Sequence, residues 1–559
     1  MTSDQRGREG AFSLVDEPWV RVRHTDGALG ELSVREVFRQ ARDIERIAGE
    51  TPQQDYALLR MLLVVFWRAH RQDELVQNDD ADDHAEWWAS QFLGEQADAA
   101  VEDYLDEVTP RWDLLDPEAP FMQVADLHTL KGEHSEITKL LPDAESPYFS
   151  VRAGQELESL SFAEAARWLI HLQAWNYSGI KSGAVGDPRV TDGKGPPIGT
   201  GWSGRTGGVV LHGRTLAETL VLNTVPGLVF TEDTEGDLPV WERVPDTAAP
   251  RTVERATGPA DLLTWQIRRV RLFHEADRVI GALVSNGDKL AWEDQLADPM
   301  TAYRVGEKQS KAAGRDVLMP RKHAAERTLW RGIEPLLTQA GEAATASRPP
   351  WTVAQLAAMK DALLDADRSV TNLLVTAELV GAEYGTMHST VVATLREELP
   401  LRLAVLLDQN PRTRRMVVDA AESTMESAID FGRFSGALRQ AAGGDYVFDT
   451  QATGEALDGF VEPFKAWLRE VTPDEEPGRQ LERWTTAVEK ALDARAYAAV
   501  QTAGPRAVIG REDADGRLLS AAVVHAVFRR RLAQRSGRGG PRPDTADLIR
   551  QTPITERTS

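Results

Sequence analysis

The sequence predicts an α+β protein: a large mixed N-terminal domain with short antiparallel strands, followed by an antiparallel four-helix bundle. Two observations indicate this fold class. Before about residue 350, short alternating apolar runs are interleaved with helical periodicity and turn residues, which favours antiparallel strands among helices. After it, apolar residues recur at helical spacing in long segments, which is typical of a bundle. We expect the two domains to cover residues 1–396 and 397–559.

The first elements are expected to be a β-hairpin and a helix. Residues 11–23 alternate between apolar and polar side chains in their second half, and a turn at Gly27 leads into a second short strand. Ser33, with Glu36 three residues later, has the spacing of a helix capping box. The run Asp55–Arg68 is apolar on nearly every side, so it predicts a buried helix.

A long loop is the next distinctive feature. Helices are expected at 85–93, 97–108 and 160–175, and the stretch Asn176–Gly208 then loses every apolar period and becomes rich in glycine and proline. Loops of this length inside a compact chain are usually functional or disordered. A tolerated surface insertion is the alternative interpretation.

Within this loop, Gly199–Gly204 spells G-x-G-x-x-G, but a dinucleotide-binding motif must follow a strand and open a helix. Here the motif follows two prolines and leads into the short β-type run Val209–His212, so we reject a dinucleotide site. Glycines still allow backbone amides to approach a ligand closely. Ser203, Arg205 and Thr206 add donors that suit phosphate.

The second half of the chain contains one more predicted hairpin and then helices. Val279–Val284 is β-like, and Asn286-Gly287 directly after it is a typical hairpin-turn pair. From Thr352 onward we expect an almost wholly helical chain. Its clearest helical segments are 415–441, 455–470, 480–500 and 516–534. The residues from Ser536 are rich in glycine, proline and arginine and are expected to form a flexible tail.

Composition narrows the possible functions. The 559-residue chain has no cysteine, which excludes disulfides and thiolate metal sites and suits a cytoplasmic protein. The N-terminal residues lack an apolar core, and the apolar runs are too short to cross a bilayer, so we expect neither a signal peptide nor a membrane span. The net charge of −23 argues against a sequence-independent nucleic-acid binder but allows local basic surfaces.

No catalytic set can be assembled from the residues. The histidines lack H-E-x-x-H or other metal-ligand spacing, and neither G-x-S-x-G nor G-x-x-x-x-G-K-[ST] occurs. We therefore expect a protein that is not an enzyme and that uses no metal or cofactor. An unrecognised hydrolase stays open as an alternative.

Several runs occur in an order that matches a known family. These runs are Leu14–Val22 (LVDEPWVRV), Asp116–Gln123 (DPEAPFMQ) and Gly201–Gly207 (GWSGRTG), followed by Leu216–Asn223 and the helical C-terminal region. Together they resemble the CasA family, the large subunits of the type I-E Cascade complex in CRISPR defence. The resemblance covers nearly the whole chain, and the Phe-Met-Gln run is its most specific part.

The resemblance implies a non-catalytic subunit of an RNA-guided surveillance complex. Such a subunit recognises the protospacer-adjacent motif (PAM) in double-stranded DNA, promotes duplex opening and R-loop formation, and helps recruit the helicase–nuclease. Its partners would be the other Cascade subunits, the 5′ end of the CRISPR RNA (crRNA), the target DNA and the helicase–nuclease, with no membrane. A structural scaffold that binds a helical protein partner, without DNA readout, is the alternative.

The resemblance also implies roles for individual residues. The PAM-binding glycine loop corresponds to Gly201, Ser203, Gly204, Arg205, Thr206 and Gly207, and a DNA-binding lysine finger to Lys289. The wedge that opens the duplex corresponds to Met387, His388 and Ser389, where the family often has a glutamine. The loop at the crRNA end corresponds to Tyr148, Phe149, Val151 and Arg152. Basic residues that would guide DNA are Arg268, Arg269, Arg271, Arg412, Arg414 and Arg415. The alternatives are a tolerated surface insertion for the glycine loop, a solvent-facing hairpin-turn lysine for Lys289 and a helix–helix turn for the wedge. For the crRNA-end loop the alternative is a loop anchored by two aromatic residues, and for the basic residues it is a solvated helix face or tail.

Overall fold

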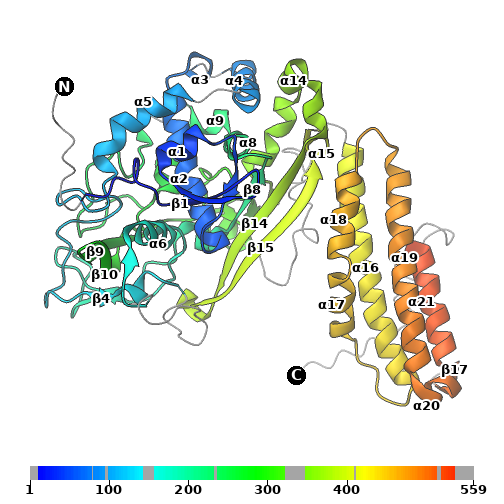
Figure 1. Cartoon of the computed structure of the whole chain (residues 1–559). Coiled ribbons are helices and arrows are strands. Elements are labelled where there is room, and N and C mark those ends of the chain that lie inside the picture. The colour runs from blue at the N-terminus through cyan, green and yellow to red at the C-terminus, as the bar shows by residue number, and fades with distance from the viewer. Residues whose placement is uncertain are drawn as a thin grey trace. The chain divides into compact units, whose positions relative to one another are not determined.

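The chain separates into two compact units, with the division after Leu407. The computed structural model describes residues 11–77, 80–94, 98–142, 157–231, 236–321, 347–407, 411–512, 516 and 518–535. The first unit mixes helices with short antiparallel strands, and helices dominate the second, so the expected α+β class is confirmed (Figure 1). The boundary expected after residue 396 falls inside strand β15, Val391–Arg402, which lies in the first unit.

Helix α2, Pro52–His70, is buried along nearly its whole length, as its apolar sequence predicts. The Thr51 side chain accepts a hydrogen bond from the Gln54 amide, and proline takes the first helical position, where no N–H is needed. The helix packs against α5, Ala99–Val108, and α6, Phe162–Trp175. It thereby provides the central packing surface for the elements around it.

The N-terminal hairpin consists of β1, Val20–His24, and β2, Leu29–Leu32, and a third strand, β3, Ile44–Ile47, pairs with the other side of β1. The capping box predicted for Ser33 and Glu36 is present at the start of the helix that follows β2. Both sequence predictions for this region are therefore confirmed.

The remaining elements of the first unit are mostly short. Its other helices are α1 Val34–Arg39, α3 Glu74–Gln77, α4 Ala81–Leu93, α7 Trp202–Thr206, α8 Leu216–Leu222, α9 Pro226–Val229, α10 Pro259–Leu263, α11 Glu307–Ala313, α13 Trp351–Ala354, α14 Leu356–Ala366 and α15 Leu403–Leu407. Its short strands include β4 Ser135–Glu136, β5 Leu160–Ser161, β6 Lys181–Ser182, β7 Lys194–Gly195, β8 Gly208–His212, β11 Tyr303–Val305, β12 Leu318–Pro320 and β13 Ser347–Arg348.

Strands β9, Arg268–Glu275, and β10, Arg278–Asn286, form an antiparallel hairpin whose turn lies at its other end from the Asn-Gly pair. Asn286 pairs with Arg268 at the open end of this hairpin. The prediction of a turn at Asn286-Gly287 is therefore wrong. A side chain at Gly287 would overlap the Gln266 carbonyl oxygen, so glycine is needed there for close packing of two chain segments.

After the short helices α13 and α14, a long antiparallel hairpin interrupts the almost wholly helical chain expected from Thr352 onward. It consists of β14, Leu374–Tyr384, and β15, and the two strands run side by side along the first unit (Figure 1). Strand β8 pairs with the other edge of β14. Ala, Leu and Glu in both strands, and Arg in β15, favour a helix by local propensity, but pairing along the whole hairpin and with β8 outweighs that preference.

The second unit is an antiparallel bundle built on α16, Pro411–Ala441, and α19, Pro477–Thr502 (Figure 1). Two consecutive helices, α17 Thr450–Asp458 and α18 Val461–Glu470, together occupy the place of one long helix, and α21, Ala521–Arg535, completes the bundle. A short helix, α20 Gly504–Ile509, and the two-residue strands β16 Arg511–Glu512 and β17 Leu518–Leu519 connect α19 to α21. Among the described residues, no helix is both long and apolar enough to cross a membrane.

Candidate nucleic-acid interface

The glycine-rich stretch ends in the short helix α7, which is packed inside the first unit. A side chain at Gly201 would overlap the carbonyl oxygen of Ala174 at the end of α6. A side chain at Gly204 would overlap the phenol oxygen of Tyr384 at the end of β14. These two glycines are therefore required because three chain segments approach one another closely at α7.

The polar side chains of α7 point mostly inward. Ser203 and Thr206 are each 1% exposed, and the Thr206 hydroxyl donates to the Gly207 carbonyl oxygen at 2.7 Å. Arg205 is half-buried, its guanidinium stacks on the Trp292 ring, and this burial lowers its pKa to about 9. Of the side chains expected in the PAM-binding loop, Arg205 alone reaches the surface in part.

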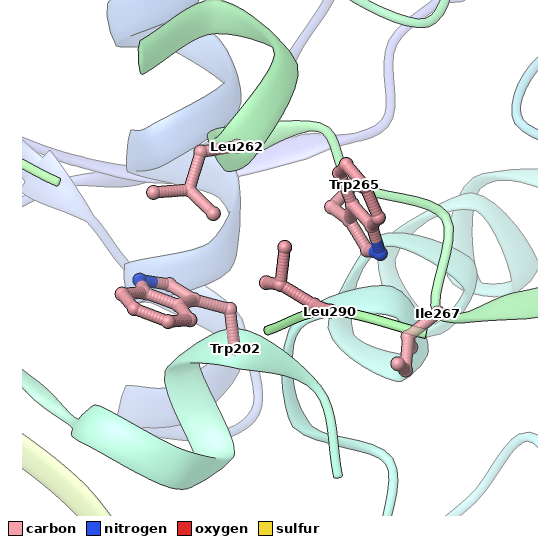
Figure 2. Close-up of a cluster of buried hydrophobic side chains, with 5 residues drawn as sticks. All are labelled: Trp202, Leu262, Trp265, Ile267 and Leu290. Carbon is pink, nitrogen blue, oxygen red and sulfur yellow. The ribbon is translucent and has the colours of Figure 1, made fainter. Parts of the chain in front are cut away.

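A buried carboxylate fixes α7 from within. The indole N–H of Trp202 and the guanidinium of Arg60 each donate to the same oxygen of Asp298, both at 2.7 Å. Asp298 is fully buried and Arg60 is 2% exposed, so this is an interior ion pair. Trp202 also packs into a buried hydrophobic cluster with Leu290 (Figure 2). The cluster contains Trp202, Leu262, Trp265, Ile267 and Leu290.

Lys289 precedes Leu290 and is therefore held near α7 by that same cluster. Its side chain is 55% exposed, and its ammonium contacts both carboxylate oxygens of Glu254 at 3.1 Å. Lys289 lies after the end of β10 rather than in a hairpin turn. An exposed cation thus lies next to the segment that supports the glycine-rich stretch.

The residues expected to form the wedge lie at the tip of the β14–β15 hairpin. Met387 is 85% exposed and His388 is half-buried, and both have φ of 56°, a left-handed conformation that is uncommon outside glycine. The Ser389 hydroxyl donates to the Thr386 carbonyl oxygen at 2.9 Å, which closes the turn. The turn therefore holds an unbranched apolar side chain out from the protein surface.

Arg268 and Arg269 lie inside the protein. Arg268 is fully buried and donates to the Asn176 side-chain oxygen at 2.7 Å and to the Tyr177 and Gly199 carbonyl oxygens at 2.7 and 2.9 Å. This burial lowers its pKa to about 9. Arg269 is 2% exposed and pairs with buried Asp288 at 2.7 Å. This interior placement does not fit the strand-guiding role expected for these two arginines. Arg268 ties β9 to the glycine-rich stretch, and Arg269 ties β9 to Asp288, which follows β10.

The other expected basic residues have mixed surroundings. Arg271 is half-buried over the Phe273 ring. Arg412 and Arg415 are exposed on α16, whereas Arg414 is 5% exposed and does not fit a strand-guiding role. The expected crRNA-end residues lie outside the described residues; they are Tyr148, Phe149, Val151 and Arg152.

Two features of this site have no separate motif in the sequence. Tyr384 fills the space beside Gly204, and Asn176 accepts the hydrogen bond from Arg268 that ties the start of the glycine-rich stretch to β9. Alternation of apolar and polar side chains over Val375–Leu379 is the signal that could have placed a strand just before Tyr384. Within the described parts of the chain, no group of three or more His, Asp or Glu side chains is arranged to hold a metal ion.

The hairpin also carries a charge network that makes stability depend on pH. Burial of Glu378 on β14 favours its neutral form, but hydrogen bonds and charge from His212 and Arg396 outweigh that effect and lower its pKa to about 2. A lowered pKa stabilises the fold above the unfolded value of about 4.5, and this contribution is lost as the pH falls through 2.

We therefore expect the Glu378→Gln variant to lose less stability than the wild type between pH 5 and pH 2. The difference in the free energy of unfolding should reach about 3 kcal/mol, because one pKa unit corresponds to about 1.4 kcal/mol. Urea unfolding at a series of pH values measures it, with Glu118→Gln as an exposed carboxylate control. Parallel pH curves for wild type and Glu378→Gln would contradict this prediction.

Comparison with known proteins first gives a class, the CRISPR-associated proteins. A family described as CRISPR-associated protein Cse1 matches residues 13–494 of this chain. Because this match covers most of its length, the chain belongs to the Cse1 family. A relative from Thermus thermophilus is described as CRISPR-associated protein CasA/Cse1, so the expected resemblance to CasA is confirmed.

The relatives differ in how much of the chain they cover. The Thermus thermophilus relative is 31% identical over 341 residues, which span 59% of this chain and 61% of the relative. The crystal structure of Thermobifida fusca Cse1 is 32% identical, with a TM-score of 0.82 over 95% of this chain and 99% of that one. Cse1 from Acidimicrobium ferrooxidans is 25% identical, with a TM-score of 0.78 over 96% and 100%.

A structure described as a CRISPR RNA-guided surveillance complex contains a chain with the same fold. That chain has a TM-score of 0.68 and 20% identity, and the match covers 93% of this chain and 99% of that one.

Proposed function

We propose that this chain is a non-catalytic subunit of an RNA-guided CRISPR surveillance complex that recognises the PAM in double-stranded DNA and opens the adjacent duplex. The observation that carries the proposal is the tip of the β14–β15 hairpin, where Met387 is 85% exposed beside the segments that hold α7. Its family membership and the surveillance complex with the same fold support the assignment.

The chemistry of the site suits contact with a duplex rather than a reaction. Apolar side chains inserted between base pairs unstack them, and Met387 is unbranched and exposed at a closed turn. Lys289 and Arg205 are cations on neighbouring segments, and cations bind DNA through its phosphates and through the minor groove. The minor groove carries a degenerate pattern of acceptors, so readout there tolerates several related PAM sequences.

The remaining parts of the proposal concern partners. In the complex, this subunit would lie at the crRNA 5′ end, contact the other Cascade subunits and help to recruit the helicase–nuclease once the R-loop has formed. Guide–target base pairing would then read the target, and this chain would read the PAM alone.

The test is binding of the assembled complex, with its guide RNA, to matched targets. The PAM is first selected by the wild-type complex from a library of randomised flanking sequences. We expect tighter binding to the target with the selected flank than to the same target with a scrambled flank. Equal binding to both would overturn PAM recognition and favour a structural scaffold, for which the bundle would be the surface to test.

Lys289→Ala is expected to weaken binding to the target with the selected flank by about tenfold, because one cation next to the PAM is lost. Its exposed pair with Glu254 contributes little to folding, so the melting temperature should stay nearly unchanged. Lys465→Ala removes a Lys–Glu pair of the same 3.1 Å length from the second unit and is the control. Equal losses on selected and scrambled flanks would mean that Lys289 contacts phosphates and reads no sequence.

A further inference from the structure

Tyr384 connects three parts of the candidate interface. It is the last residue of β14, and its phenol O–H donates to the carbonyl oxygen of Trp175, the last residue of α6, at 2.6 Å. Its ring also occupies the space that a side chain at Gly204 in α7 would need. There, an added Cβ would overlap the phenol oxygen and lie 3.0 Å from the ring carbon that bears it.

The hairpin tip has a second connection to the same place. The amide N–H of Ser178, just after α6, donates to the carbonyl oxygen of His388 at 2.8 Å. Within the tip, the rings of Tyr384 and His388 meet edge to face, with their centroids 6.2 Å apart. A further hydrogen bond joins the start of α7 to the end of α6: the Gly201 amide donates to the Asn176 carbonyl oxygen at 3.0 Å.

We propose that Tyr384 is a positioning residue that couples α7 to the hairpin tip, so that contact of DNA with the α7 region fixes the direction in which Met387 points. This inference rests on the proposed function. Tyr384 does not itself touch DNA in this scheme. It acts by keeping the tip, the end of α6 and α7 in one arrangement.

The physical reason is that a side chain acting as a wedge must be held in a fixed position. A side chain that must enter a base step loses effect when its support shifts by about 1 Å, because the favourable contacts of insertion are short-ranged. A two-stranded ribbon on its own twists and bends easily, and contacts at its end restrict that motion. Tyr384 supplies such a contact four residues before His388, and the glycine at position 204 is what allows it.

The test is a double-mutant cycle on Gly204→Ala and Tyr384→Phe. Gly204→Ala places a methyl group where the phenol oxygen lies, and Tyr384→Phe removes that oxygen while keeping the ring. We expect Gly204→Ala to lower the melting temperature of the full chain. The double variant should recover part of that loss, because the methyl group then fills the vacated volume and the ring has only to shift slightly. If the losses of melting temperature in the two single variants simply add in the double variant, the two residues are not in contact.

The second readout follows duplex opening in the assembled complex, through the fluorescence of a base analogue at the first target base pair. We expect opening to be about tenfold slower in Gly204→Ala on an intact target, faster again in the double variant, and unchanged in every variant on a target mismatched at that position. A purely structural role would not distinguish the two targets. If Tyr384→Phe suppresses the effect of Gly204→Ala on melting temperature but not its effect on the rate of duplex opening, the proposed coupling is wrong.

The two proposals fail in different ways. If the wild-type complex binds scrambled and selected flanks equally, the proposed function fails, and the coupling to DNA opening fails with it. If the wild type prefers the selected flank but the cycle shows no suppression, the coupling alone fails and PAM recognition stands. A variant that does not fold is identified by its melting curve. In that case Tyr384→Phe, which keeps the half-buried ring, tests the coupling by its opening rate on the intact target compared with the mismatched one.

Discussion

Replacing both Met387 and His388 by alanine is expected to slow R-loop formation on an intact target by about tenfold or more, while binding to the PAM stays nearly unchanged. Unstacking the first base pair costs a few kcal/mol, and an inserted side chain offsets that cost. Met387 is 85% exposed at the tip of the β14–β15 hairpin, so its truncation removes little packing. Truncation of half-buried His388 removes its ring contact with Tyr384 but keeps the backbone hydrogen bond from Ser178 to residue 388, so the hairpin is expected to stay folded. Single-turnover kinetics of R-loop formation on duplex targets measure the effect.

Two controls make this experiment specific. On a target already mismatched next to the PAM, the cost of opening is removed, so the double alanine variant should behave like the wild type. Leu374→Ala changes a 43% exposed apolar side chain at the other end of the same hairpin and should leave the rate unchanged on both targets. An equal delay on the intact and the mismatched target would show that the tip does not act as a wedge.

Removing the buried carboxylate of Asp298 is expected to give the largest loss of stability. Asp298→Ala leaves the Arg60 guanidinium, which is 2% exposed, without its counter-charge. Breaking a buried pair in this way costs about 3–5 kcal/mol. The substitution also removes the acceptor for the Trp202 indole at 2.7 Å, so α7 should loosen as well. Urea unfolding of the full chain measures the change.

The control is an exposed pair in the same unit. Asp106→Ala removes one partner of Arg35 at 2.9 Å, and since Asp106 is 73% exposed the expected change is at most about 1 kcal/mol. A double variant, Arg60→Met with Asp298→Ala, should recover part of the loss, because no unpaired cation then stays buried. If the double variant is no more stable than Asp298→Ala, the loss comes from the hydrogen bonds to Asp298 rather than from the ion pair.

Local patterns in the sequence were sufficient wherever the deciding interactions lie within a few residues. The capping box of Ser33 and Glu36 involves neighbours in one turn, and α2 is apolar on nearly every side, so its burial follows from composition. The long amphipathic segments of the C-terminal region specify a helical bundle for the same reason. Family membership follows from the order of several such local runs and required no tertiary contact.

Tertiary contacts decided the features that depend on residues far apart in the chain. Strands β14 and β15 contain helix-favouring residues, and only their pairing with each other and with β8 makes them strands. Asn286-Gly287 has the composition of a turn, yet its glycine is required by the Gln266 carbonyl oxygen, which approaches from another segment. Arg268 has the charge of a DNA-binding residue, but packing buries it among carbonyl oxygens that the folded chain brings together.

In the candidate interface, too, some features follow from the local sequence and others depend on tertiary contacts. The sequence alone determined that a glycine-rich stretch and an unusual Met-His turn exist and which family they belong to, because these are runs of neighbouring residues. Only the tertiary structure placed Gly204 against Tyr384 and left Met387 exposed beside them. The physical reason is that burial and close approach depend on which distant segments pack together, and that choice is made by the free energy of the whole core rather than by any local pattern.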